Sequence, residues 1–567
     1  MCGFLFSVSD EPNESFNSVL ESFKYRGPDS SNSKRIEING KYIDFGFNRL
    51  SIQDLTTASD QPFYDEDSFM LFNGEIYNFK ELRVYLQNKY KYYCETSGDT
   101  EVLFYLLKFE GEYCLDKIRG MFSILYVDLR ELFVIAARDT VGEKPLYFST
   151  FEDKYFFASE FNSLRKLSKN NKLNKDNIKE LFECGYVQAP NTIVDGLFKV
   201  LPGCYLKFNL IDGPKLDFQR YWSPLKVENQ SCNSSYSIRK DRLKLLLTDA
   251  VEEQLCADVP VAILLSGGLD SSIIAGIASK IRHKDIETFS VSIGSDEVYN
   301  ESKHSNKVAN FLESKHHQIL LDNPNFDELL NILDEVDEPI DDSSFIPTYL
   351  LTKSVAKNVK VAIGGDGADE LFGGYNSYRR ILPYNKLLTI LNRFNFNDFK
   401  NWSYFSKIFQ NYPKLWSHLL IHEEISSSKE MTYLQSYMFN DFLNYLPNDI
   451  LVKTDRASMK NSLELRSPFL DKRIVEFAYN DCFIDDKISR YETKRILRDV
   501  GKEFLPIDFE FNRKQGFSIP ASWINTIEDR MGSEYFTWKD GFIKDYLDGK
   551  KSKRTLLFIL IFKLNHE

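Results

Sequence analysis

The sequence predicts two regions of different fold class. The first is an α+β region with antiparallel sheets, and the second is an α/β region with a parallel sheet and a helical C-terminal part. Three observations predict this arrangement. The 567 residues exceed what one hydrophobic core usually supports. Short period-two apolar runs dominate the first 210 residues or so, and continuous apolar runs alternating with helical patterns follow a polar, proline-containing stretch.

The first region is expected to contain short strands separated by turns and a few helices. The expected strands are Tyr42–Phe47, Ser68–Phe72, Phe122–Val127, Leu132–Ala136 and Tyr155–Ala158. Helical patterns cover Phe79–Gln87 and Thr100–Phe109. Strands and helices that do not alternate regularly are typical of an α+β domain with antiparallel sheets.

The polar stretch Ser223–Ser235 marks the change between the two regions. We therefore expect a first domain over residues 1–215, a linker over 216–235 and a second domain over 236–567.

The second region begins with Val259–Leu265, a continuous apolar run that is typical of a buried parallel strand. A glycine-rich turn follows, and then a helical stretch over Ser272–Ile281. The next expected elements are strand Thr288–Ile293, helix Glu301–Lys315, strand His316–Leu321, helix Asp327–Val336 and strand Val359–Ile363. This alternation predicts a doubly wound parallel sheet, and the part beyond about residue 375 reads as mostly helical.

Composition excludes several classes of function. The net charge of −12 argues against nucleic-acid binding, because phosphate contacts need clustered Lys and Arg. No run approaches the roughly 18 apolar residues of a membrane span, so we expect no membrane insertion. The N-terminus has no basic segment and does not read as a signal peptide. Eight cysteines without a C-x-x-C spacing favour a reducing, cytoplasmic setting.

The first region has no histidine, because the earliest of the seven is His283. A Ser-His or Cys-His pair within that region is therefore excluded. Removal of Met1 would leave Cys2 with a free α-amine, which has a pKa of about 8 and can serve as the base for its own thiol. The alternative is that Cys2 is only the second residue and has no chemical role.

Four further residues in this region are candidates, and each has an ordinary alternative. Asn73 and Gly74 offer a side-chain amide and a backbone N–H as donors to an oxyanion, but Asn-Gly is also the commonest hairpin turn. Arg49 can pair with a substrate carboxylate or form a surface salt bridge. Asp99 can bind a substrate ammonium group, cap the next helix, or do both.

The segment Leu264–Ser272 lies between a buried strand and a helix, where a loop can bind an anion. Gly267 and Gly268 allow close approach of the backbone, and the helix N-terminus adds positive potential. The loop is neither a Walker A sequence nor G-x-G-x-x-G. Its remaining candidate residues are the hydroxyl donors Ser266, Ser271 and Ser272 and the candidate Mg²⁺ ligand Asp270.

A second acidic segment follows another expected strand of the same sheet. Asp366, Asp369 and Glu370 place three carboxylates at the edge where such sheets bind ligands, and Mg²⁺ between them and a phosphate loop would explain them. The alternative is that they cap a helix. Lys494 can stabilise a leaving pyrophosphate, although its spacing alone is that of a surface lysine on a helix.

Taken together, these segments resemble the glutamine-dependent asparagine synthetase family over nearly the whole chain. The N-terminal half is similar to class II glutamine amidotransferase domains, with matches at Met1-Cys2-Gly3, Arg26-Gly-Pro-Asp29, Arg49-Leu-Ser-Ile52, Gln61-Pro62, Asn73-Gly-Glu-Ile-Tyr-Asn78, Ser97-Gly-Asp-Thr-Glu-Val102, Arg138-Asp139 and Ala158-Ser-Glu160. The C-terminal half is similar to the ATP-pyrophosphatase domain, with matches at Ser266–Ser272, Asp337-Glu-Pro339 with Asp342, Gly365–Tyr375, Asp455-Arg-Ala-Ser-Met459, Glu464-Leu-Arg-Ser-Pro-Phe-Leu-Asp471 and Lys514-Gln-Gly-Phe517.

The resemblance implies an Ntn-hydrolase αββα sandwich followed by a nucleotide-binding domain, with glutamine, aspartate and MgATP as substrates and no tightly bound organic cofactor. It makes Cys2 the glutaminase nucleophile and Asp366 the acidic residue linked to acyl-adenylate formation. The glutamine site implied by the resemblance contains Arg49, Asn73, Gly74, Glu75 and Asp99. The ATP site implied by the resemblance contains Leu265, Val291, Gly364, Gly365 and the Ser266–Ser272 loop. Asp270 and Asp369 are the expected Mg²⁺ ligands, and a homodimer is left open.

The sequence departs from the family pattern at a few positions. Tyr25 stands where many members have His, Gly46-Phe47 replaces Gly-His, Gly364 replaces Ser, and Asp366 replaces a Glu found in some members. These departures leave the chemical groups in place but leave the acceptor open. The main hypothesis is asparagine synthesis. A second is amidation of another carboxylate, such as a uronic acid of a surface polysaccharide, and a third is a binding protein without turnover.

Overall fold

The computed structural model describes residues 2–151, 154–225, 234–293, 302–321, 324–392, 431–513, 521–550, 552 and 554–566. Three features expected from the sequence lie wholly or partly outside these residues. They are the linker, through its residues 226–233, the first residue of the helix expected at Glu301–Lys315, and the segment Lys514–Phe517. The domain boundaries expected from the sequence stay a prediction.

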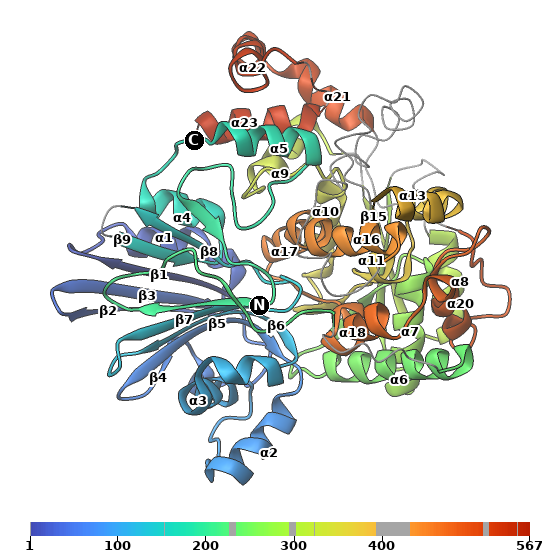
Figure 1. Ribbon diagram of the computed structural model, residues 1–567, viewed down its shortest axis with the longest axis horizontal. Helices are drawn as coiled ribbons and strands as arrows, with labels where there is room; N and C mark the ends of the chain where they lie inside the picture. The colour runs from blue at the N-terminus through green and yellow to red at the C-terminus, as the bar shows by residue number, and fades with distance from the viewer. Residues whose placement is uncertain are drawn as a thin grey trace.

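The first region contains two antiparallel six-stranded sheets, as the sequence predicted (Figure 1). The first sheet has the order β10-β8-β9-β1-β3-β2, with strands Leu197–Lys199, Tyr147–Phe151, Lys154–Ala158, Gly3–Ser9, Lys41–Arg49 and Ser30–Ile38. The second has the order β12-β11-β7-β6-β5-β4, with strands Gln219–Arg220, Cys204–Asn209, Phe133–Arg138, Gly120–Asp128, Ser68–Ile76 and Phe63–Tyr64.

The two sheets face each other across an aromatic core. Phe6 and Phe45 of the first sheet are buried with Phe69 of the second, and the rings of Phe45 and Phe69 stack with centroids 4.0 Å apart. Helices cover the outer faces, so that the region is an αββα sandwich. The first sheet is covered by α1 (Phe16–Ser22) and α4 (Phe161–Ser168), and the second by α2 (Phe79–Tyr90) and α3 (Thr100–Glu110), whereas α5 (Lys175–Cys184) lies beside α22 and α23. Cys2 directly precedes β1, a central strand, and is therefore held inside the sandwich.

The second region contains a parallel five-stranded sheet, also as predicted. Its order is β15-β14-β13-β16-β17, with strands Lys315–Leu321, Glu287–Ile293, Val261–Leu264, Val361–Ile363 and Glu464–Arg466. The helices up to the first large gap are α6 (Tyr236–Gln254), α7 (Leu269–Ile281), α8 (Ser302–Leu312), α9 (Phe326–Asp334), α10 (Phe345–Val355), α11 (Ala368–Phe372), α12 (Asn376–Ile381) and α13 (Asn385–Asn392). Because β13 and β16 are adjacent, the segments that follow their carboxyl ends lie side by side.

The remaining part is helical, with β17 as its strand among the described residues. Its helices are α16 (Tyr433–Asn440), α17 (Leu451–Met459), α18 (Lys472–Asn480), α19 (Ile484–Lys487), α20 (Arg495–Gly501), α21 (Ala521–Arg530), α22 (Ser533–Tyr546) and α23 (Thr555–His566). Figure 1 shows α17 between the sandwich and α16, with α21, α22 and α23 at the top of the view. Within the described residues, no helix has the length and apolar character needed to cross a membrane.

Candidate functional site

Cys2 lies in a buried position beside the strand that carries Asn73. Its backbone N–H donates to Asn73 Oδ1 at 3.1 Å, and its Sγ lies 3.9 Å from the carbonyl oxygen of Leu50. Burial raises the pKa of the Cys2 thiol, so the thiolate is not the resting form at neutral pH. A nucleophilic role for Cys2 therefore requires a base close to the sulfur.

Asn73 and Gly74 lie within β5, and the hairpin-turn alternative is wrong. The strand continues to Ile76, and Asn73 and Gly74 pair with Ser123 and Phe122 of β6. The side-chain amide of Asn73 donates to Ser123 Oγ at 3.4 Å. A Cβ on Gly74 would lie 2.1 Å from the carbonyl oxygen of Met121, so only glycine fits.

Arg49 and Asp99 are both buried, in different surroundings. The Arg49 guanidinium pairs with Asp60 at 2.7 Å and donates to the carbonyl oxygen of Thr56 at 2.8 Å, so in this structure it closes the loop that follows β3. Asp99 stands at the N-cap position of α3, but its side chain makes no capping bond; it accepts from the backbone N–H of Ile76 at 2.9 Å. Burial raises the pKa of Asp99 to about 6.

Glu75 links the sandwich to the parallel sheet. One of its carboxylate oxygens lies 3.2 Å from a terminal nitrogen of Arg466, which is fully buried at the end of β17. Burial, with the nearby charge of Asp99, raises the pKa of Glu75 well above its usual range. The backbone carbonyl of Arg466 also accepts from the N–H of Gly364, so Arg466 contacts candidate residues of both sites.

The serine-glycine loop occupies the turn between β13 and α7. Ser266 Oγ lies 3.0 Å from Ser271 Oγ and accepts from the N–H of Gly268 at 3.3 Å, which folds the loop over the helix N-terminus. Gly267 has φ +74°, and a Cβ there would lie 2.6 Å from the backbone nitrogen of Ser305. Ser272 is fully buried, and its hydroxyl has no hydrogen-bond partner among the described residues. The turn has the geometry of an anion-binding loop.

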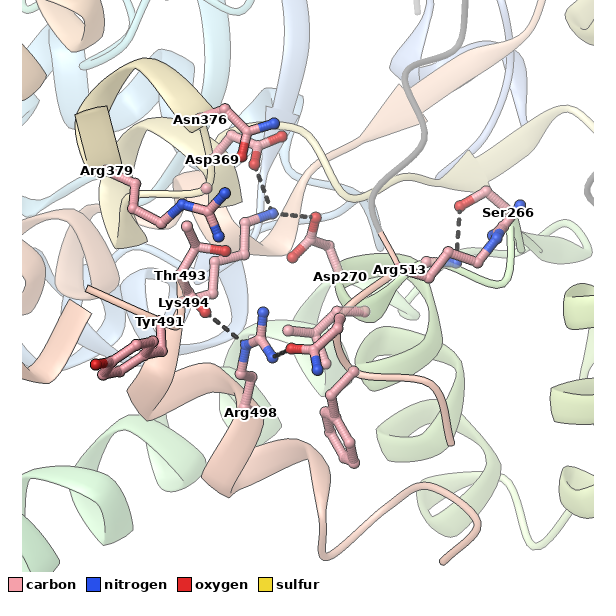
Figure 2. A pocket seen from close by; sticks show the side chains of 15 residues that line it. Ser266, Asp270, Asp369, Asn376, Arg379, Tyr491, Thr493, Lys494, Arg498 and Arg513 are labelled. Atoms are coloured by element: carbon pink, nitrogen blue, oxygen red, sulfur yellow. Dashed lines mark hydrogen bonds and ion pairs between the residues drawn. The ribbon is translucent and has the colours of Figure 1, made fainter. Parts of the chain in front are cut away.

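Lys494 lies between two carboxylates at the edge of a cavity of about 240 Å³ (Figure 2). Its ammonium group is 2.6 Å from Asp270 Oδ2 and 2.8 Å from Asp369 Oδ1. Burial alone would lower the pKa of Lys494, but the two carboxylates outweigh it and raise the pKa. The surface-lysine alternative is therefore wrong, since Lys494 is buried and paired. Arg379, Arg498 and Arg513 line the same cavity, so its cationic side chains outnumber its carboxylates.

Five candidate residues line this cavity, and the other candidates of the second region lie outside its lining. Ser266, Gly268, Asp270, Asp369 and Lys494 belong to the lining. Gly365 is close to Asp270, because a Cβ on it would be 3.1 Å from the Cβ of that residue. Asp366 accepts a hydrogen bond from Thr454 Oγ1 at 3.1 Å. The side chains of Leu265 and Val291 are buried in apolar clusters that flank the sheet.

The expected magnesium ligands are close together, and their chemistry suits the ion. No group of three or more potential metal ligands occurs in the described part of the chain. Asp270 and Asp369 nevertheless converge on one ammonium group beside the loop, and two carboxylates supplemented by phosphate oxygens are a usual Mg²⁺ site.

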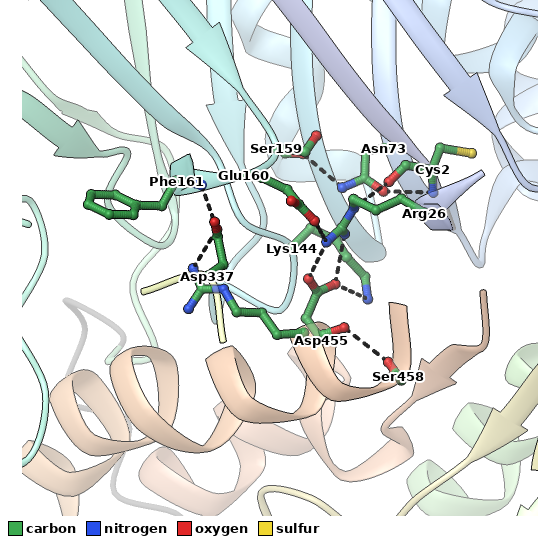
Figure 3. Close-up of polar contacts among 12 residues, drawn as sticks. Cys2, Arg26, Asn73, Lys144, Ser159, Glu160, Phe161, Asp337, Asp455 and Ser458 are labelled. Carbon is green, nitrogen blue, oxygen red and sulfur yellow. Dashed lines mark hydrogen bonds and ion pairs between the residues drawn. The ribbon is translucent and has the colours of Figure 1, made fainter. Parts of the chain in front are cut away.

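The sequence analysis missed three residues that connect the two halves. Arg26, fully buried, donates from Nε to the carbonyl oxygen of Cys2 at 3.0 Å and pairs with Asp455 of α17 (Figure 3). The third residue is Arg466, which forms an ion pair with Glu75 of the sandwich. All three lie in segments that carry the family resemblance, Arg26-Gly-Pro-Asp29, Asp455-Arg-Ala-Ser-Met459 and Glu464–Asp471, and that was the only signal for them.

Comparison with known proteins identifies both halves. The family model described as asparagine synthase matches residues 242–537, and the one described as glutamine amidotransferase domain matches residues 1–222. The chain is similar to "Asparagine synthetase [glutamine-hydrolyzing] 1" of Bacillus subtilis, at 28% identity over 100% of this chain and 96% of that protein. It is 26% identical to "Asparagine synthetase [glutamine-hydrolyzing] 3" of the same organism, over 93% and 89%.

A relative from Methanocaldococcus jannaschii, "Putative asparagine synthetase [glutamine-hydrolyzing] 2", is 31% identical over 65% of this chain and 74% of its own length. Among solved structures, a glutamine phosphoribosylpyrophosphate amidotransferase from B. subtilis covers 67% of this chain and 78% of its own, with 16% identity and a TM-score of 0.29, which is too low to establish a shared fold.

The two halves together define a glutamine amidotransferase joined to an ATP-dependent, amide-forming ligase. The chain belongs to the family of glutamine-hydrolysing asparagine synthetases, because the asparagine synthase model alone spans more than half of it. The expectation drawn from the motifs is thereby confirmed at the level of the family. The acceptor of the amide nitrogen is not fixed by relatives at about 28% identity.

Proposed function

We propose that this protein synthesises asparagine from aspartate, with glutamine as the nitrogen donor and ATP as the activating substrate. The observation that carries the proposal is the presence of both candidate sites in one chain of the family: Cys2 beside Asn73, and Lys494 between Asp270 and Asp369. Each group required for the two half-reactions thus has a candidate residue.

In the glutaminase half, the sulfur of Cys2 attacks the side-chain amide of glutamine. The α-amine that removal of Met1 leaves on Cys2 takes the thiol proton, because the sandwich offers no imidazole. Asn73 Nδ2 and the backbone N–H of Gly74 donate to the oxyanion. The protonated α-amine returns its proton to the amide nitrogen, which departs as ammonia when the tetrahedral intermediate collapses to the thioester. Water then releases glutamate. Asp99 supplies negative charge for the substrate ammonium, the Glu75 carboxyl offers it a hydrogen-bond acceptor, and Arg49 supplies positive charge for the substrate carboxylate.

In the synthetase half, the β-carboxylate of aspartate attacks the α-phosphorus of ATP. Pyrophosphate leaves, the β-aspartyl-AMP carbonyl is attacked by ammonia, and AMP leaves. Lys494 stabilises the departing pyrophosphate by its charge, while the Ser266–Ser272 loop binds phosphate oxygens through its hydroxyls and N–H groups. Asp270 and Asp369 would hold Mg²⁺, which supplies charge neutralisation for the phosphates.

Ammonia has to reach the second site without meeting bulk water, where it would be protonated. Tyr77 and Met121 of the sandwich form a buried cluster with Met459 of α17, and this contact across the two halves supports an apolar internal passage. The passage is part of the proposal.

The acceptor is tested by pyrophosphate release from MgATP with ammonium as the nitrogen source. Aspartate and a uronic acid are supplied in parallel, each with a no-acceptor control. We expect release that depends on aspartate and matches the asparagine formed. Release with the uronic acid alone would move the reaction to the second acceptor, and nucleotide binding without release under either acceptor would favour the binding protein.

A further inference from the structure

Helix α17 contacts both candidate sites through consecutive residues. Thr454 donates from Oγ1 to Asp366 Oδ2 at 3.1 Å, on the synthetase side. The next residue, Asp455, turns to the sandwich and pairs with Arg26. Successive residues of a helix point about 100° apart, so one rigid turn presents a side chain to each site.

The contact between Asp455 and Arg26 is bidentate and closed to solvent. Arg26 Nη1 and Nη2 donate to the two oxygens of Asp455 at 2.9 and 3.1 Å, and both side chains are almost completely buried. Burial alone would raise the pKa of Asp455, but the charges of Arg26 and Lys144 outweigh it and lower the pKa, so the carboxylate is ionised. A planar guanidinium held at both terminal nitrogens has little rotational freedom left.

The third nitrogen of the same guanidinium donates a hydrogen bond to the backbone of Cys2, the proposed nucleophile. Arg26 Nε donates to the backbone carbonyl of Cys2 at 3.0 Å. That carbonyl belongs to the residue whose amine and thiol take part in the chemistry, and it lies before the first strand residue, Gly3. Figure 3 shows the chain of contacts from α17 through Asp455 and Arg26 to Cys2.

We propose that Asp455 is a positioning residue for the glutaminase nucleophile: acting through Arg26, it fixes the backbone of Cys2, so that a helix of the ATP-dependent half sets the reactivity of the glutamine site. This proposal rests on the proposed function only in taking Cys2 as the nucleophile. A salt bridge that merely joined the two halves would stabilise the protein without affecting Cys2 in particular.

The test is Asp455→Asn, which keeps the shape of the side chain and removes its charge. Glutaminase kcat is expected to fall about 10- to 100-fold, the usual cost of a small misplacement of a reacting group, with the KM for glutamine changed by less than about threefold. The rate at which iodoacetamide alkylates Cys2, followed by mass spectrometry of the N-terminal peptide, is expected to fall as well. Neither readout requires knowledge of the acceptor.

Glu253→Gln is the matched control. Glu253 of α6 pairs bidentately with Arg119 of the sandwich, at 2.6 and 2.9 Å, and its partner does not contact Cys2. The substitution also neutralises a carboxylate between the two halves, and kcat and the alkylation rate are expected to stay within about twofold of wild type.

A double-mutant cycle with Arg26→Lys checks that Asp455 acts through Arg26. Adding Asp455→Asn to Arg26→Lys is expected to lower kcat by less than about threefold further. If Asp455→Asn lowers the melting temperature too far for kinetics, Asp455→Glu, which keeps the charge but displaces it by one methylene, is expected to lower kcat and the alkylation rate.

The proposal is overturned by a folded Asp455→Asn protein with wild-type kcat and alkylation rate, by equal losses in Glu253→Gln, or by independent effects in the cycle. A wild-type protein without any glutaminase activity would instead overturn the assignment of Cys2.

Discussion

Cys2, the proposed glutaminase nucleophile, is buried in a region whose sequence contains no histidine. Burial raises the pKa of its thiol, and the first histidine of the sequence is His283. The base that remains is the α-amine of Cys2 itself, which lies where Asn73 Oδ1 accepts the Cys2 N–H. Removal of Met1, which frees this α-amine, is therefore as important for the proposed chemistry as Cys2 itself.

Cys2→Ala is expected to abolish glutamine-dependent product formation and to leave ammonia-dependent formation within about threefold of wild type. The physical reason is that the substitution removes the sulfur but none of the groups around Lys494. The measurement is pyrophosphate release with glutamine and, separately, with ammonium chloride. If both activities survived unchanged, Cys2 would have no catalytic role.

The carboxyl of Asp99 gives the glutamine site its own pH dependence. Burial raises the pKa of Asp99 to about 6, and only the ionised form attracts a substrate ammonium group. As the pH falls, log kcat/KM for glutamine is expected to decline with slope one below the amine pKa of about 8. The slope steepens to about two below pH 6, because Asp99 then also takes up a proton.

Initial glutaminase rates from pH 5 to 9 measure these slopes. In Asp99→Asn the plateau is expected to be lower and the slope to remain near one throughout. A steepening that persisted in Asp99→Asn would assign it to a different group.

At the scale of elements, the sequence located four of the five strands of the parallel sheet, but several strands of the sandwich, β1 among them, and many helices were not placed. The apolar run Val259–Leu265 contains β13, Val261–Leu264, because a strand buried on both faces is apolar throughout. The sequence predicts a strand over Ser68–Phe72 that ends before Asn73-Gly74, but β5 continues to Ile76. Helix α6 was missed, although Leu243, Leu247 and Val251 recur every four residues and are buried.

Strand β5 can continue past Asn73 because two glycines, Gly74 of β5 and Gly120 of β6, allow the two backbones to come close together. A Cβ on Gly74 would lie 2.1 Å from the carbonyl of Met121, and a Cβ on Gly120 would lie 2.1 Å from the carbonyl of Glu75. The two glycines therefore permit a close approach that no sequence pattern reports, because each depends on the backbone of a residue in the other strand.

Gly74→Ala is expected to lower the free energy of unfolding by about 1–3 kcal/mol, through the clash with Met121, and to reduce glutaminase kcat by shifting Asn73. Gly541→Ala is the control. Gly541 lies inside α22 with open space around its Cα, and alanine there is expected to raise the free energy of unfolding by about 0.5–1 kcal/mol. Urea unfolding measures both. Equal stabilities of Gly74→Ala and wild type would contradict the close approach.

At the scale of the whole molecule, the two halves meet through buried polar contacts. Arg26 and Asp455 are 429 residues apart in the sequence. Glu75 forms an ion pair with Arg466, which lies in β17, the edge strand of the parallel sheet. Hydrophobic period and motif spacing report local structure, so they predicted two regions of different fold class and candidate residues within each, but none of these pairings. Asp270, Asp369 and Lys494 were each predicted as candidates. The sequence did not predict that both carboxylates would contact the Lys494 ammonium group.

The transfer of nitrogen from one half to the other is tested most directly with amide-¹⁵N-labelled glutamine. The wild-type protein is supplied with MgATP and aspartate, and pyrophosphate and the products are measured by ¹⁵N NMR and mass spectrometry. The account predicts asparagine labelled in its amide, in an amount equal to the aspartate-dependent pyrophosphate. Label found only in free ammonium, with no pyrophosphate that depends on aspartate, would contradict it.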